Sequence, residues 1–253
     1  NLTQEVRMSA GPIILGGYYK RLIEQDTAFD NNGWLIGEAT DGNSHYNFQI
    51  KAGYAQYEYN FDPSIKLKTN VRYEKNSLNY NGTSDGLNQK WEKITLPPIR
   101  FNIDHAMFGY RTALHYLKDK FTSFYGSVSQ GYKSGGVNQQ PFLSDASRPY
   151  EPEFIQNFEI GLKRATKKYQ TQLSAFYSLR KDQQVSVSSQ QDKENPNSFL
   201  FYTGNAGSGT IQGFEWENTL NLSSNLNMDA SLGYLTTWVN KFTYFAAEGV
   251  EAI

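Results

Sequence analysis

Apolar and polar side chains alternate along this chain with a period of two, the spacing of a β-strand whose two faces meet different surroundings. The clearest segment spans residues 65–74. Its two sets are Ile65, Leu67, Thr69, Val71 and Tyr73 against Lys66, Lys68, Asn70, Arg72 and Glu74. Residues 169–180 and 226–238 repeat the pattern, with Phe176 as the single exception on a polar set. These segments are predicted to be strands.

Weaker alternation predicts further strands. They span residues 4–10, 12–20, 48–61, 107–116, 121–132, 155–163, 199–203 and 209–222. The count is about ten or eleven strands, and many run for nine residues or more, against about 5 to 6 in a soluble protein. No run reaches the roughly 18 apolar residues of a transmembrane helix. If the chain crosses a membrane, it must therefore do so as tilted strands, for which about 9 to 11 residues suffice.

The connections alternate in length. Short turns are predicted at residues 62–64, 118–120, 166–168 and 223–225, and long polar stretches at residues 21–45, 76–100, 133–152 and 181–197. Tight turns at one end and long loops at the other are typical of an up-and-down barrel of the outer membrane. We therefore predict an all-β, antiparallel, up-and-down transmembrane β-barrel. The alternative is a soluble β-sandwich, whose apolar face would meet a second sheet instead of lipid.

Aromatic residues cluster near the predicted strand ends. They are Tyr57, Tyr59 and Phe61, then Tyr116 and Phe121, then Trp238 and Phe242. Rings with a polar tip are favoured at the bilayer interface, so these positions are predicted to form aromatic girdles. In a sandwich they would instead be ordinary core residues.

The charge balance and the motifs exclude several classes of function. Lys and Arg number 24 and Asp and Glu 25, so no basic excess favours nucleic acid. The chain has no cysteine, and His45, His105 and His115 do not show a metal-ligand spacing. No nucleophile-elbow, phosphate-loop or dinucleotide motif is present. We therefore predict neither an enzyme nor a cofactor or metal site.

Several ordered segments resemble one family, the TonB-dependent outer-membrane receptors. The run 124–138, FYGSVSQGYKSGGVN, resembles the family's YGSVSKGYRSGGFN strand and loop. Residues 150–163 resemble its Y-x-P-E followed by N-Y-E-L-G-L-K. Residues 4–7 with 16–19 are similar to its QELR and GGYY hairpin. Each piece is weak alone, and the specificity lies in their order over nearly the whole chain.

The resemblance implies a barrel of 22 strands, filled by an N-terminal plug and energised by the TonB complex through a TonB box. The chain shows no plug, no TonB box and no terminal strand. We therefore expect residues 1–253 to be part of the barrel domain of a longer outer-membrane receptor.

The function implied is TonB-dependent active import of a scarce ligand, in the first place a ferric siderophore. Haem, cobalamin and oligosaccharide remain open as cargo, and the alternative class is a non-transporting β-protein: a soluble carbohydrate-binding sandwich or a structural barrel. Loops carry recognition in such scaffolds. The predicted ligand contacts are therefore Lys133, Arg148, Tyr150 and Lys193, in stretches 133–152 and 181–197, because cationic and aromatic side chains suit an anionic or aromatic chelate.

Overall fold

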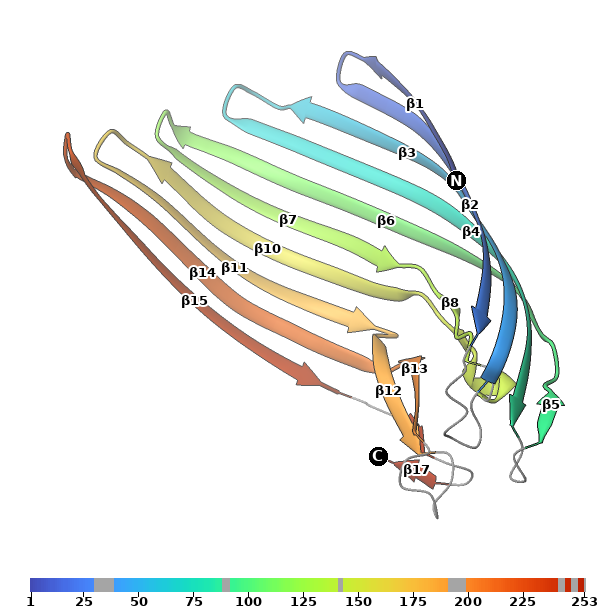
Figure 1. The fold of residues 1–253 in the computed structure, drawn as a ribbon. Coiled ribbons are helices and arrows are strands. Elements are labelled where there is room, and N and C mark those ends of the chain that lie inside the picture. The colour runs from blue at the N-terminus through green and yellow to red at the C-terminus, as the bar shows by residue number, and fades with distance from the viewer. Residues whose placement is uncertain are drawn as a thin grey trace.

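One large antiparallel sheet dominates a computed structural model of the chain (Figure 1). The structure describes residues 1–29, 39–87, 92–140, 143–190, 199–240, 244–246 and 250–252. The sheet contains β1 (Leu2–Ala10), β2 (Ile13–Phe29), β3 (Ala39–Asn60), β4 (Ile65–Leu87), β5 (Lys93–Thr95), β6 (Ile99–Asp119), β7 (Thr122–Lys133), β10 (Glu153–Ala165), β11 (Tyr169–Lys181), β14 (Ser208–Ser223) and β15 (Leu226–Val239). Strands neighbouring in this series pair side by side, except that β5 is a short addition to β4. This is the meander that the sequence predicts.

The remaining elements are short and lie between these strands. They are β8 (Gly136–Val137), the 3-10 turn η1 (Asp145–Ser147), β9 (Pro149–Tyr150), β12 (Gln184–Gln190), β13 (Phe199–Asn205), β16 (Tyr244–Ala246) and β17 (Val250–Ala252). The strand expected at residues 199–203 therefore exists, but it pairs with β12 outside the large sheet. Within the described ranges, no helix is long and apolar enough to cross a membrane.

Tight turns join the strands at one end of the sheet, which we call the turn end. Two of these turns are closed by an aspartate. Asp62 Oδ1 accepts hydrogen bonds from the Ser64 amide at 2.6 Å and the Ile65 amide at 3.0 Å, and Asp119 Oδ1 accepts one from the Phe121 amide at 2.8 Å. Aspartate commonly closes turns in this way. The long connections all lie at the opposite end, which we call the loop end, so the predicted asymmetry is confirmed.

The predicted bounds of two long connections are wrong. Residues 21–29 continue β2, residues 39–45 begin β3, and residues 76–87 continue β4. The sequence pattern misses these extensions because polar side chains predominate in them and apolar residues such as Leu78 and Tyr80 are too few to show a period, so apolar alternation stops while backbone pairing goes on. β4 consequently reaches 23 residues, about twice the 9 to 11 needed to cross the hydrocarbon.

The two faces of the sheet differ in chemistry, and ladder register shows how. Leu162, Leu173, Trp216 and Leu232 lie side by side across β10, β11, β14 and β15 on one face, which we call the outer face. Large apolar side chains remain exposed there: Val6, Met8, Leu15, Val71, Tyr73, Phe108, Leu114, Phe124, Phe158, Ile160, Leu173, Phe214, Met228, Leu232 and Tyr234. The opposite, inner face carries the polar sets. This is the arrangement of a barrel wall with lipid outside.

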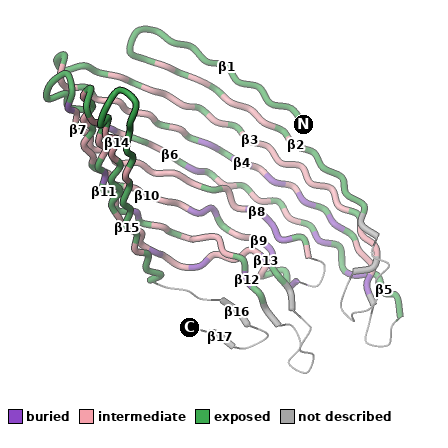
Figure 2. The backbone as a smooth tube through the Cα atoms, turned by 60° about the vertical axis from the view of Figure 1, so that its left-hand side comes forward, coloured by how far each residue is buried: buried purple, intermediate pink, exposed green. Residues whose placement is uncertain are grey.

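The aromatic girdle positions also fall where the pattern puts them. At the turn end, Tyr57, Tyr59, Tyr116 and Phe121 are exposed, and Trp238 is exposed near the far end of β15. Phe242 lies outside the described residues. Figure 2 shows how the exposed stretches run along the strands and how the sheet curves across its width.

Large rings on the inner face lie over glycines of the neighbouring strand. Phe176 is directly opposite Gly213, and Tyr125 is opposite Gly161. A Cβ at Gly213 would overlap the Tyr234 carbonyl oxygen and come within 2.9 Å of the Phe176 ring, and one at Gly161 would overlap the Tyr125 ring. These glycines make room for a ring, which explains why Phe176 stands in an otherwise polar set.

Candidate ligand-binding site at the loop end

The connection between β7 and β10 folds onto the inner side of the tall strands. Its residue Val137 is buried in a cluster with Leu78, Tyr80 and Ile99, which come from the extended parts of β4 and β6. Asn76, also on β4, donates a hydrogen bond to Ser134 Oγ at 2.8 Å. The strand extensions therefore anchor this connection.

Gly135 and Gly136 allow the β7–β10 connection to pack closely against β9 and β6. A Cβ at Gly136 would overlap the Tyr150 ring, and a Cβ at Gly135 would overlap both the Tyr150 carbonyl and the His105 ring. The carboxylate of Glu151 lies 3.4 Å from His105 Nε2. The Ser-Gly-Gly part of the sequence motif is thus required by packing between β8, β9 and β6.

The hairpin of β12 and β13 is tied to the same connection. Asn138 Nδ2 donates to the Thr203 carbonyl at 2.7 Å, and the Thr203 amide donates to Asn138 Oδ1 at 2.8 Å. The Glu151 amide donates to Asn205 Oδ1 at 2.7 Å. Leu143, Val187 and Tyr202 form a second buried cluster between the two segments. The β7–β10 connection, which is the first stretch predicted to contact ligand, and the β12–β13 hairpin, whose β12 lies in the second stretch, therefore form one unit, which we call the loop unit.

The structure places three of the four predicted ligand contacts. Lys133 is the exposed last residue of β7, opposite Glu153 of β10. Arg148 is only 3% exposed: its Nε donates to Asp145 Oδ1 at 3.0 Å and its Nη1 to the Gln140 carbonyl at 2.6 Å. Tyr150 is partly buried, and this burial raises the pKa of its hydroxyl. Lys193 lies outside the described residues.

Below the loop unit, the inner face carries a polar network that sequence reasoning did not assemble. The Arg72 guanidinium donates to Glu74 and, at 3.2 Å, to the Tyr132 hydroxyl, and it lies 5.3 Å from the centre of the Tyr18 ring. Arg72, Glu74 and Tyr132 border a hollow of about 580 Å³. The alternation in β4 predicts that Arg72 and Glu74 share one face. Nothing local in the sequence indicates their common partner, Tyr132, which is 58 residues from Glu74.

Two further networks line the same face. Tyr125 donates to Glu159 Oε1 at 2.6 Å, while Ser178 Oγ donates to Asn157 Oδ1 at 2.7 Å. Nearer the loop end, Arg180 pairs with Glu153, whose second oxygen accepts the Gln184 amide at 2.9 Å. The last contact joins the barrel wall to the loop unit. Among the described residues, no group of three or more His, Cys, Asp or Glu side chains is placed to hold a metal ion.

Comparison with known proteins agrees with this geometry. Residues 2–252 match the family described as TonB dependent receptor-like, beta-barrel. The chain belongs to this family. A search of curated proteins gives no significant match.

Solved structures of similar fold are receptors and transporters. This receptor barrel matches the ferric yersiniabactin uptake receptor FyuA from Yersinia pestis with a TM-score of 0.71 and 16% identity, over 98% of this chain and 37% of that one. It matches the siderophore receptor PiuA from Acinetobacter baumannii with a TM-score of 0.61 and 14% identity, over 99% and 40%. It matches the FrpB iron transporter from Neisseria meningitidis with a TM-score of 0.59 and 15% identity, over 92% of this chain and 34% of that one.

At these identities the likeness establishes the fold of the receptor barrel and no more. The chain spans less than half the length of each of these three solved proteins. The family consists of transport receptors and is not a family of enzymes.

Proposed function

We propose that this receptor barrel is part of the wall of an outer-membrane protein that imports a scarce ligand actively, using energy from TonB. The observation that carries the proposal is the two-faced sheet. Its outer face exposes apolar side chains over a band that starts at the turn end, and its inner face is polar. An outward apolar band, short periplasmic turns and long outer loops are the features of this class.

The proposed cargo is a ferric siderophore. Two of the solved structures of similar fold carry that function in their names, as an uptake receptor for ferric yersiniabactin and as a siderophore receptor. The loop unit supports the choice chemically, because it offers an exposed lysine, Lys133, and the partly buried ring of Tyr150. Cations and aromatic rings suit anionic or aromatic chelates.

We propose Lys133, Arg148, Tyr150 and Lys193 as the residues that recognise the ligand, with different parts to play. In this proposal Lys133, which is exposed, contacts the ligand directly. Arg148 is held by Asp145 and Gln140, so its part is to fix the shape of the connection that presents Tyr150.

The alternative of a soluble sandwich requires a second sheet over the apolar face. Within the described ranges, the large side chains of that face are exposed instead, as Leu232 at 57% and Ile160 at 67% illustrate. Lipid is the partner that such a face fits. A purely structural barrel stays open until uptake is measured.

The test is uptake of radiolabelled ferric siderophore by cells that make the full-length receptor, with and without a functional TonB. We expect uptake only when both are present, in cells whose receptor fractionates with the outer membrane. Lys133→Ala should weaken ligand binding, whereas Lys118→Ala should not, because Lys118 is an exposed lysine at the turn end of β6, the opposite end of the sheet. Uptake independent of TonB, or a receptor found outside the outer membrane, would refute the proposal.

A further inference from the structure

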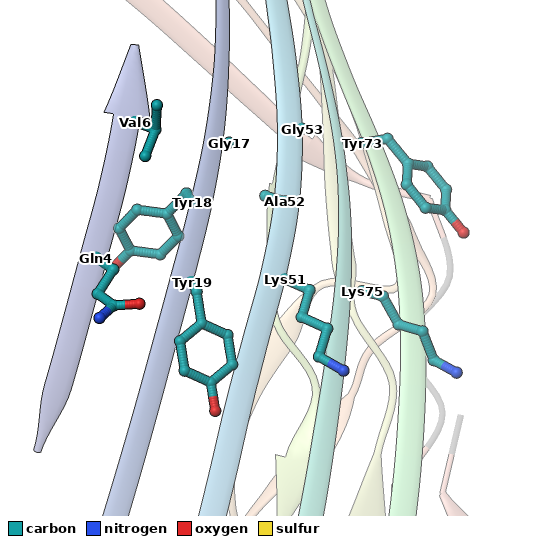
Figure 3. A pocket seen from close by; sticks show the side chains of 10 residues that line it. All are labelled: Gln4, Val6, Gly17, Tyr18, Tyr19, Lys51, Ala52, Gly53, Tyr73 and Lys75. Carbon is teal, nitrogen blue, oxygen red and sulfur yellow. The ribbon is translucent and has the colours of Figure 1, made fainter.

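A groove on the outer face of β1 to β4 has two rows, which we call the polar row and the notch row (Figure 3). By register, the polar row, nearer the loop end and lower in Figure 3, consists of Gln4, Tyr19, Lys51 and Lys75. In the notch row, nearer the turn end, Val6 and Tyr73 stand on either side of Gly17 and Gly53. The groove has a volume of about 490 Å³.

Neither backbone conformation nor packing requires glycine at positions 17 and 53. Gly17 and Gly53 are directly opposite each other, and a Cβ added to either would meet nothing within 4 Å. Neither has the positive φ that favours glycine; Gly11 in the β1–β2 turn is the described glycine that does. Glycine in a strand interior weakens the strand and often marks a place where a ligand approaches closely. The consequence here is an open notch between Val6 and Tyr73.

The polar row concentrates positive charge. Lys51 and Lys75 are directly opposite on neighbouring strands, an arrangement of like charges that is unfavourable without an anion nearby. Lys75 has one carboxylate, Asp104, at 3.3 Å, whereas none of the ion pairs in the described ranges includes Lys51. Arg21 follows Tyr19 by two residues on the same face of β2. Lys51, Lys75 and Arg21 thus have one carboxylate among them, that of Asp104.

The distance of the polar row from the turn end matches the thickness of the hydrocarbon layer. From Ile65 at the turn end to Lys75 is ten residues along β4. At about 3.4 Å per residue and a tilt of about 40°, that is about 26 Å, against an apolar band of about 25 Å. Figure 3 shows the polar tips of Tyr19, Lys51 and Lys75 all pointing the same way, away from the notch. They are therefore at the level of the headgroups in the outer leaflet.

We propose that this groove binds a phosphorylated glycolipid of the outer leaflet, with a phosphate between Lys51 and Lys75 and an acyl chain in the notch over Gly17 and Gly53. The inference rests on the outer-membrane location proposed above and goes beyond it, because it adds a lipid site that transport does not require. Charge complementarity selects the phosphate, and the adjoining apolar notch selects a lipid over a free anion.

The experiment measures binding of lipid A, the phosphorylated glycolipid anchor of that leaflet, to purified full-length receptor in detergent by native mass spectrometry. Lys51→Gln with Lys75→Gln should weaken binding about 25-fold, since each cation near such a surface contributes about a fivefold factor. The matched control is Lys66→Gln with Lys68→Gln, which removes two charges from the inner face of the same sheet and should leave binding unchanged. Lipid A without phosphates should bind as weakly to the wild type as intact lipid A binds to the double variant.

A second variant fills the notch without touching charge. Gly17→Val with Gly53→Val fits the free space and should weaken lipid A binding while heat-modifiable migration in gels confirms a folded barrel. Unchanged binding in the Lys51 and Lys75 variant, an equal loss in the control, or equal binding of inorganic phosphate and lipid A would overturn the lipid site. A receptor that imports its ligand but fails these tests refutes this inference alone, whereas one outside the outer membrane refutes the proposed function.

Discussion

Two neighbouring rows of the sheet show what organises this molecule. Leu173, Trp216 and Leu232 form one row on the outer face, and the adjacent row, one residue along each strand, is Gln172, Glu217 and Ser231. In a soluble protein the apolar row would be buried, yet Leu232 is 57% exposed while Ser174, nearby on the inner face, is 6% exposed. Side chains of adjacent residues on one strand therefore point to opposite surroundings, lipid on one face and a polar interior on the other. The predictions below test that difference.

The largest effect is expected from placing a charge on each face of β15. Leu232→Arg should lower the free energy of unfolding by about 2 to 4 kcal/mol, because the side chain enters hydrocarbon near the middle of the band. Ser231→Arg should lower it much less, because that side chain points into a wet interior. Reversible unfolding of the full-length barrel in lipid vesicles measures both. Equal losses would mean that the faces are assigned wrongly.

The second comparison uses one residue type on both faces. Gly161→Val should cost about 1 to 3 kcal/mol, because the new side chain overlaps the Tyr125 ring on the inner face. Gly17→Val on the outer face meets open space and should cost less or nothing. The same vesicle unfolding assay distinguishes them, and a larger loss at Gly17 would contradict the inner-face packing described above.

A third test breaks an ion pair on the inner face. Glu153→Gln should lower the free energy of unfolding by about 1 to 2 kcal/mol, because it leaves the Arg180 guanidinium, 26% exposed, without its charged partner. Glu58→Gln, which breaks the more exposed pair with Lys66, should have a smaller effect. Protection of the Gln184 amide from hydrogen exchange should fall in the first variant and not in the second.

The smallest effect concerns the turn end, where both faces meet water. Hydrogen bonds from the Ser64 hydroxyl and amide hold the pKa of Asp62 below its ordinary value of 3.8. A carboxylate whose pKa is lower in the folded state stabilises that state above the ordinary pKa. This contribution should be lost as pH falls from about 4 through the lowered pKa. Asp62→Ala should flatten this part of the stability curve, measured as unfolding at successive pH values, and an unchanged curve would assign the acid sensitivity elsewhere.

The sequence predicts the part of the fold that touches lipid, and the reason is physical. Where one face must be apolar, alternation is strict, and the register of β4, β11 and β15 can be derived from it. Beyond the apolar band, as in residues 41–47, the outer face is polar, strict alternation is not required, and the sequence pattern does not show that the strand continues. The β12–β13 hairpin was expected only as one strand, because nothing local indicates that it leaves the sheet.

The candidate site was predictable as a region but not as a set of contacts. Arg148 is a cation in a polar stretch, and its burial depends on partners, Asp145 and the Gln140 carbonyl, whose positions follow from the folded connection. Asn138, whose amide group joins the two connections, has no distinguishing mark in the sequence. The role of Lys193 stays a prediction.

The unequal strand lengths have a consequence for the connections at the loop end. Counted from the turn end, β4 runs for 23 residues and β11 for 13, a difference of about 33 Å along the strand. Figure 1 shows the strands from β2 to β6 continuing well past the ends of β10 and β11. The loop-end edge of the large sheet is therefore oblique: β3, β4 and β6 extend further from the turn end than β10 and β11 do. The loop unit occupies the step that this difference leaves at the ends of β10 and β11, and its Val137 packs on Leu78 of the longer β4. The long strands therefore act as a support against which the described connections fold.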